Sequence, residues 1–149
     1  MKIRTRNFGD IEIEKDKIIR FEEGIPAFEK EKEFVLIFNE DKENPFHSLQ
    51  SVSREELSFI VINPFEIFKD YDILLPDTAI NKLKIEKEED VNIYTIVVVP
   101  EDINKMTTNL LGPIVINTKK RLGKQVILDD KRYTTKHFIF NQDSKVGGQ

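Results

Sequence analysis

The segment Val91-Asn92-Ile93-Tyr94-Thr95-Ile96-Val97-Val98-Val99 carries the strongest structural signal in the chain. β-Branched residues dominate the segment, and such residues favour a pleated strand over a helix. In a strand, its odd-numbered residues would lie on one face and its even-numbered residues on the other. Pro100 follows directly and ends the pattern. The segment therefore predicts the main β-strand of the fold.

Shorter extended segments come before this strand. Residues 1–14 alternate apolar and charged side chains around an Asn7–Asp10 turn, which predicts a hairpin whose strands each have one wet face. Phe34–Phe38 is apolar on both faces, as expected of a buried central strand. The other predicted strands of this half are Ile18–Phe21 and Leu57–Ile62, with a short extended piece around Leu49–Ser51.

Two extended regions and one helix complete the expected elements. Met106–Asn117 predicts a long strand, but Pro113 cannot donate to a ladder and predicts a bulge, an edge or a bend. Gln125–Leu128 and Tyr133–Phe138 predict a final hairpin. The helix is expected to begin near Pro76-Asp77 with Asp77 as its cap, and to place Ile80 and Leu83 on one face.

Many short strands and one short helix predict a mainly β chain that folds as an antiparallel barrel or sandwich. The length of 149 residues fits a single domain, which we place at residues 1–140. Residues 141–149 are polar and contain Gly147-Gly148, and they predict a disordered tail.

The charge is spread unevenly along the chain. Residues 1–117 hold 15 basic and 24 acidic residues, whereas residues 118–149 hold 8 basic and 3 acidic residues. A mostly acidic surface repels phosphate backbones and attracts basic partners, which argues against direct nucleic-acid binding. The first residues lack the apolar run of a signal peptide, and no apolar stretch is long enough for a bilayer, so we expect a cytoplasmic protein without membrane contact.

Residue constellations that carry catalysis are not found in the sequence. The chain has no cysteine, and its two histidines, His47 and His137, lie in separate segments without a companion at metal-ligand spacing. No glycine-rich phosphate loop or nucleophile elbow is present. The acidic run Glu86–Asp90 predicts a solvated connection. We therefore expect no enzyme activity, no cofactor and no metal.

Phenylalanine is the informative residue type. The chain has eleven, and several follow Pro or Gly in loops: Phe28, Phe46, Phe65 and Phe68. One interpretation is that these rings fold inward and cap the ends of the barrel. The other is that they form an exposed aromatic rim that anchors a partner helix. The sequence leaves both open.

An ordered set of motifs resembles the FliW family of flagellar assembly factors, from about Lys2 to His137. Single motifs such as Gly24-Ile25-Pro26 are weak, but their order and spacing across the chain are specific. Ala27 and Gly112 depart from the family pattern by exchanging one small residue for another. The motifs are Phe21–Glu29, Pro45-Phe46, Leu49–Ser51, Phe59–Pro64, Asn109–Asn117, Gln125–Leu128 and His137.

The resemblance implies a small antiparallel β-barrel-like single domain and a non-enzymatic regulator with two competing protein partners. One partner is flagellin, contacted near its helical termini. The other is CsrA, a small basic RNA-binding dimer that represses flagellin translation. Free flagellin would sequester the protein, and export of flagellin would release it to bind CsrA. We expect it to act as a monomer.

We choose candidate binding residues for each partner by their charge or their apolar character. Acidic positions suit the basic CsrA, and loop aromatics suit the amphipathic helices of flagellin. The expected CsrA residues are Glu12, Glu14, Glu22 and Glu23, and the expected flagellin residues are Phe28, Phe46 and Phe65.

A direct RNA-binding barrel is the alternative function. It would need a basic face with interleaved aromatic residues. Only Lys119–Lys124 offers basic density, and no aromatic residue is interleaved there. We interpret this cluster as a solvated hairpin turn.

Overall fold

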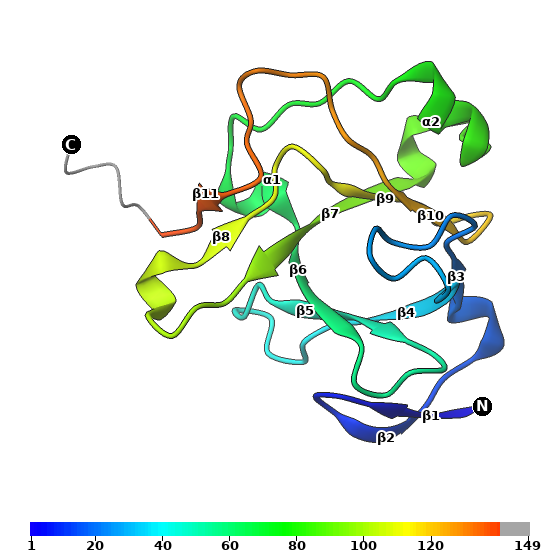
Figure 1. Ribbon diagram of the computed structural model, residues 1–149. Coiled ribbons are helices and arrows are strands. Elements are labelled where there is room, and N and C mark those ends of the chain that lie inside the picture. The colour runs from blue at the N-terminus through cyan, green and yellow to red at the C-terminus, as the bar shows by residue number, and fades with distance from the viewer. Residues whose placement is uncertain (141–149) are drawn as a thin grey trace.

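The computed structural model describes residues 1–140 (Figure 1), so the expectation of a tail at 141–149 lies outside the described residues. Seven strands form a closed barrel in the order β3-β4-β5-β6-β7-β9-β10, and β10 returns to pair with β3. The mainly β fold is therefore confirmed as a barrel. Its strands are β3 (Ile19–Arg20), β4 (Glu33–Ile37), β5 (His47–Ser51), β6 (Ser58–Ile62), β7 (Val91–Val98), β9 (Ile114–Asn117) and β10 (Leu122–Gln125).

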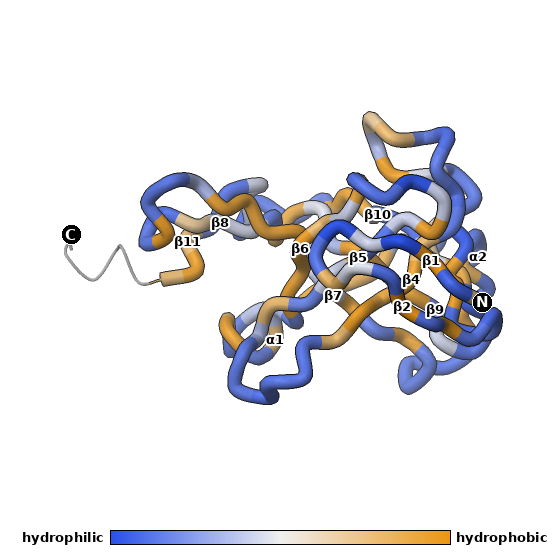
Figure 2. Tube along the Cα trace, turned by 90° about the horizontal axis from the view of Figure 1, so that it is seen from below, coloured by the Kyte–Doolittle hydropathy of each residue, from blue (hydrophilic) through white to orange (hydrophobic). Residues whose placement is uncertain are grey.

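The expected long strand is confirmed as β7, and it joins the parts of the fold. Its first half, Val91–Tyr94, pairs with β9, while Thr95 and Ile96 pair with β6. Its last residues pair with β8 (Thr107–Thr108), which in turn pairs with β11 (His137–Phe138). β8 and β11 extend the sheet on the side of the molecule opposite the N-terminus (Figures 1 and 2).

The predicted N-terminal hairpin is also confirmed. Strands β1 (Lys2–Thr5) and β2 (Gly9–Glu12) form a separate two-stranded sheet. Ile3 and Ile13 pack with Val35 of β4 in a small apolar cluster, which attaches the hairpin to the outside of the barrel. Figures 1 and 2 both place the hairpin beside β4.

The main core fills the barrel. Phe21 and Phe34 are fully buried, and their rings meet edge to face at 5.2 Å between centroids. Gly123 of β10 lies against them, where an added Cβ would stand 2.6 Å from the Phe21 ring. This position therefore requires glycine because the aromatic core occupies the space of any side chain. A second core cluster holds Ala79 and Leu83 of the α2 region against the outside of β9.

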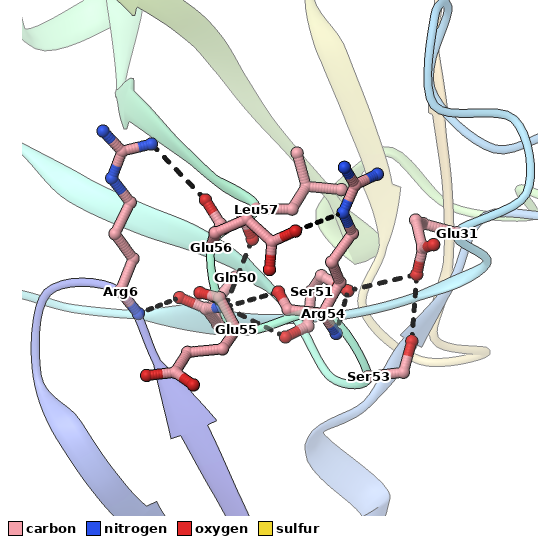
Figure 3. A network of polar contacts seen from close by, with 9 residues as sticks. All are labelled: Arg6, Glu31, Gln50, Ser51, Ser53, Arg54, Glu55, Glu56 and Leu57. Atoms are coloured by element: carbon pink, nitrogen blue, oxygen red, sulfur yellow. Dashed lines mark hydrogen bonds and ion pairs between the residues drawn. The ribbon is translucent and has the colours of Figure 1, made fainter.

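Amide side chains satisfy backbone groups where strands are irregular, and the clearest cases are Gln50 and Asn109. Gln50 is fully buried, and its Nε2 donates to carbonyl oxygens of the 51–57 turn at 3.1–3.3 Å (Figure 3). Its Oε1 accepts from the N–H of Arg6 at 3.0 Å, which links this turn to the β1–β2 hairpin. Asn109 accepts from the N–H groups of Leu111 and Gly112 before the Pro113 bend.

Some expectations about elements were wrong. Residues 126–136 contain no strand, so the expected final hairpin does not form; β10 pairs with β9 and β11 with β8. Met106–Asn117 is split into two strands because the chain bends around Pro113. The described residues also hold two α-helices and not one: α1 (Pro64–Ile67) and α2 (Asp77–Lys82), with 3-10 turns at Lys15–Lys17, Glu88–Asp90 and Ile103–Lys105.

The helix caps follow local chemistry. Asn63 caps α1, because its Oδ1 accepts from the N–H of Phe65 at 3.0 Å and Pro64 is tolerated in the first turn. The expected cap of α2 was wrong: Pro76 is the N-cap residue, and Asp77 lies in the first turn, where its charge favours the helix dipole. Neither helix has the length that a bilayer crossing requires.

Candidate functional site

An apolar groove lies beside the segment that connects α1 to α2. We name it the α1–α2 groove; it has a volume of about 580 Å³. Leu74 is 90% exposed at its edge, an unusual exposure for a large apolar side chain in a folded protein. Its lining residues are Phe65, Asp72, Ile73, Leu74, Leu75, Ile80, Ile85, Glu86, Lys87, Glu88, Val91 and Ile93.

Aromatic packing holds the rim of the α1–α2 groove in place. The Phe65 ring, 42% exposed, packs against Tyr71 at 5.3 Å. Tyr71 donates its hydroxyl to the carbonyl of Leu110 at 2.7 Å and packs against Tyr133 at 4.8 Å. Burial, with the nearby Tyr133, raises the pKa of the Tyr71 hydroxyl well above its ordinary value, so it remains a donor. Phe65 therefore presents an apolar surface on a rigid base.

A second groove lies between β2 and β4 at one mouth of the barrel. We name it the β2–β4 groove; it has a volume of about 500 Å³. Its charged lining residues are the carboxylates of Glu12 and Glu14 and the basic side chains of Lys17 and Arg121, and the exposed ring of Phe38 lies on another wall. Its lining residues are Ile11, Glu12, Ile13, Glu14, Lys17, Ile19, Val35, Leu36, Ile37, Phe38, Asn92, Tyr94, Ile116, Thr118 and Arg121.

The four expected acidic residues fall in two places. Glu12 and Glu14 both line the β2–β4 groove, where Glu12 also pairs with the N-terminal ammonium of Met1. Glu22 and Glu23 lie near the end of β10 and have local cationic partners. Glu22 accepts from Arg20 at 2.7 Å.

Glu23 is the most strongly paired of the four. Its carboxylate accepts from Lys124 and Lys82, each at 2.7 Å. These hydrogen bonds, first with Lys124 and then with Lys82, lower the pKa of the Glu23 carboxyl to about 2. The charge of Glu23 is therefore largely compensated within the chain, whereas Glu14 lies exposed on the groove wall.

The three expected aromatic residues differ in exposure. Phe28 is half-buried against Phe59, with ring centroids at 5.6 Å, and Arg54 lies over its outer face. Phe46 is half-buried and packs on a core cluster. Phe28 and Phe46 therefore pack inward, whereas Phe65 lines the α1–α2 groove. The structure brings none of the three rings together.

Lys119, Lys120 and Arg121 of the basic cluster lie in the β9–β10 turn, as expected, whereas Lys124 lies in strand β10. Lys120 pairs with Glu86 at 2.9 Å, and Lys124 pairs with Glu23. Arg121 donates to the carbonyl of Lys17 at 2.7 Å. These basic side chains therefore neutralise or cap neighbouring groups of the same chain.

The histidines take part in local packing. His47 Nδ1 accepts from the N–H of Asn39 at 3.0 Å, and its ring meets Phe38 edge to face. Burial lowers the pKa of His47, opposed by the charge of Glu66, so the neutral acceptor form is favoured. His137 Nε2 accepts from the N–H of Thr134 at 2.9 Å. Within residues 1–140, no group of three or more His, Asp or Glu side chains could hold a metal ion.

The sequence expectations missed the apolar residues that make the α1–α2 groove. Leu74 and Leu75 stand in a loop next to Pro76, where large apolar residues have no core role in the local pattern. Their position was a usable signal. The β2–β4 groove gave no such signal, because its two walls lie far apart in the sequence and meet only through the packing of the hairpin on β4.

Comparisons with known proteins agree with this architecture. The family described as FliW protein matches residues 2–139. A flagellar assembly factor FliW of Caldicellulosiruptor saccharolyticus is 47% identical over 145 residues, covering 97% of this chain and 94% of its own. One of Bacillus subtilis is 45% identical over 140 residues, covering 93% and 96%.

A solved structure agrees as well. The crystal structure of a flagellar assembly factor FliW superposes with a TM-score of 0.87 at 48% sequence identity, covering 94% of this chain and 97% of that chain. The same barrel and nearly the whole length are therefore shared. The chain belongs to the FliW family of flagellar assembly factors.

Proposed function

We propose that this chain works in the cytoplasm by binding flagellin and, when flagellin has left, by binding and antagonising the translational regulator CsrA, without catalysing a reaction. Repression of flagellin mRNA translation would then be relieved. One observation carries the proposal: two separate grooves lie on opposite faces of the first half of β7. Val91 and Ile93 line the α1–α2 groove, and Asn92 and Tyr94 line the β2–β4 groove.

Flagellin is assigned to the α1–α2 groove. An amphipathic helix binds by laying its apolar face into a hydrophobic groove, and side chains at successive turns provide the anchors. Phe65, Leu74 and Ile80 offer apolar surface for such anchors. Of the aromatic residues expected from the sequence, Phe65 takes the direct role, while Phe28 and Phe46 pack inward on the core.

CsrA is assigned to the acidic side of the β2–β4 groove. Opposite charges steer encounter and add specificity, and this effect is strongest where the carboxylates have no partner of their own. Glu14 meets this description best, and Glu12 lies beside it. Glu22 and Glu23 lie outside this groove and have a smaller role, since their charges are compensated by Arg20, Lys82 and Lys124.

Strand β7 supplies a route by which one partner can exclude the other. Because alternate residues of one strand form both walls, a partner that shifts β7 on one face changes the other face. The alternative of a direct RNA-binding barrel finds less support, because Lys120 and Lys124 are engaged in ion pairs within the chain.

Isothermal titration with cognate CsrA, with and without bound flagellin, tests the proposal. We expect CsrA to bind the free chain and to lose measurable binding once the chain is saturated with flagellin. A matched titration of flagellin into the chain, with and without bound CsrA, checks that the coupling is reciprocal. Absence of binding to both proteins would reject the proposal, and simultaneous binding of both would reject its exclusive character.

A further inference from the structure

The outer edge of strand β2 carries unpaired backbone groups. Met1 and Ile13 exchange hydrogen bonds at 2.9 and 2.7 Å, so hydrogen-bonded and non-hydrogen-bonded pairs alternate from this end of the hairpin. Asp10 and Glu12 therefore occupy non-hydrogen-bonded positions, and their N–H and C=O groups point away from β1. Within the described residues 1–140, these groups have no hydrogen-bond partner and β2 pairs with no strand except β1.

The other edge of the hairpin is placed differently. The N–H of Arg6, just beyond β1, donates to Gln50, and the Asn7 side chain donates to Ser48 (Figure 3 shows the Arg6 contact). This edge therefore faces the 51–57 turn. The β2 side faces the β2–β4 groove, because Ile11 and Glu12 line that groove and no residue of β1 does.

The side chains of β2 are sorted by face. Asp10 and Glu12 are exposed on the outer face, whereas Ile11 and Ile13 point toward the apolar floor made with Val35. Across the hairpin, Arg4 stands opposite Asp10 and Lys2 stands opposite Glu12. The hairpin thus pairs a basic row with an acidic row, and the acidic row lies on the side of the β2–β4 groove, where Glu12 also pairs with the N-terminal ammonium of Met1.

From these features we propose that the β2–β4 groove binds an extended segment of a partner protein by strand addition to β2. The inference rests on the proposed function, since it takes the acidic side of this groove as a partner surface. The segment pairs with the outward N–H and C=O groups of Asp10 and Glu12. Its residues opposite these carboxylates are basic, because opposite charges on paired strands are favourable. Its alternate residues are apolar and lie on the groove floor beside Ile11 and Phe38.

Backbone pairing separates this mode from simple charge attraction. Charged side chains on an exposed edge strand discourage pairing with other chains, and a strand of opposite charge is the one that such an edge disfavours least. The acidic row of β2 therefore selects against an acidic or uncharged strand and against a second β2 edge, which would place carboxylates opposite carboxylates.

Synthetic peptides test the inference with the full chain. The probe is an acetylated, amidated peptide of alternating lysine and valine; the controls are the same residues in two blocks and the alternating peptide N-methylated on the amides of one edge. We expect the alternating probe to bind, and the N-methylated peptide to bind at least about tenfold more weakly through loss of its backbone hydrogen bonds. Equal binding by the N-methylated peptide would overturn strand addition.

Two matched variants test the protein side. Glu12→Gln removes the carboxylate and keeps the outward N–H, whereas Glu12→Pro removes both, and proline is tolerated on an edge strand. We expect the proline variant to bind the probe about tenfold more weakly than the glutamine variant. Thermal melts establish that both variants fold, and a proline variant that binds as well as the glutamine variant contradicts the inference.

Amide hydrogen exchange by NMR locates the bound strand. We expect the Asp10 and Glu12 amides to become protected on addition of the probe. Protection of amides in the α1–α2 groove alone would overturn the inference. Protection of Asp10 and Glu12 that rises with protein concentration, without the probe, would also overturn it, because a second copy of the chain would then occupy the edge.

If CsrA binds the chain and the probe does not, strand addition fails while the proposed function stands. If the probe binds and CsrA does not, the proposed function fails.

Discussion

Strand β7 lines the α1–α2 groove with Val91 and Ile93 and the β2–β4 groove with Asn92 and Tyr94, so one short run of sequence contributes to two unlike surfaces. Most of the residues lining each groove are apolar. The β2–β4 groove differs in having the open edge of β2 and its carboxylates along one side. Burial of apolar surface is insensitive to salt, whereas exposed charges are screened by it. The two surfaces can therefore be told apart by substitutions and by ionic strength.

A charge in the α1–α2 groove should have the largest effect. Leu74→Asp removes an exposed apolar anchor, and we expect flagellin affinity to fall by about 2–3 kcal/mol, roughly 30- to 150-fold, because a buried leucine contributes about that much. Titration calorimetry measures the loss. Ile127→Asp is the matched control, since Ile127 is 64% exposed and lies outside both grooves. A similar loss in both variants would show that the groove has no special role.

A charge reversal in the β2–β4 groove should have a smaller, salt-dependent effect. We expect Glu14→Lys to weaken CsrA binding by about tenfold at low ionic strength, with the difference shrinking as salt screens the charges. Flagellin binding should not change. Glu40→Lys, at an exposed position outside both grooves, provides the same change in net charge. An equal effect of Glu40→Lys would assign the binding to overall charge and not to the groove.

A substitution that changes the backbone outside both grooves should alter stability and leave binding unchanged. Ala27 has a φ of 77°, in the left-handed region that favours glycine. We expect Ala27→Gly to raise the free energy of unfolding by about 0.5–1 kcal/mol, because the relief of strain exceeds the added chain entropy of glycine. Denaturant titration measures it. Ala79→Gly within α2 should have the opposite sign, and binding of both partners should be unchanged by Ala27→Gly.

The smallest effect concerns the compensated carboxylate of Glu23. Its folded pKa of about 2 lies below the ordinary value of 4.5, so ionised Glu23 stabilises the fold above about pH 4.5, and this contribution is lost as the pH falls toward 2. Because water screens the exposed pairs, we expect about 0.5 kcal/mol or less. Urea midpoints of wild type and Glu23→Gln should differ slightly at pH 7 and converge near pH 2. A constant difference across this range would contradict the assignment.

The sequence predicted the elements whose pattern is local. β7 was found because eight of the nine residues Val91–Val99, all except Asn92, favour strands, and the hairpin was found because its turn and alternation are both within Met1–Glu14. β10 was placed wrongly because its residues, including Gly123 and Lys124, have weak strand preference. Closure of the barrel makes this segment a strand, and apolar Val126 and Leu128 pack against α2 without joining a ladder.

The candidate sites were predicted only in part, because the sequence shows the local character of a residue and not its long-range contacts. Glu12 and Glu14 were found as acidic positions, and Phe65 was found as a loop aromatic. Burial of Phe28 and Phe46 and compensation of Glu23 depend on residues distant in the sequence, which local patterns do not report. The open edge of β2 could not be predicted, since it depends on which strands fail to pair.

The parallel contact that closes the barrel has a consequence during synthesis. Leu122 pairs with Arg20, and the Arg20 N–H donates to the carbonyl of Arg121 at 2.9 Å. Strands β3–β6 leave the ribosome well before β9 and β10 exist, so the nascent chain passes through a half-barrel whose β3 edge and aromatic core face water. Contacts between such distant segments form slowly, and exposed edges and apolar surface invite aggregation in the meantime. The closing strand therefore determines how long the β3 edge and the barrel core stay exposed after synthesis.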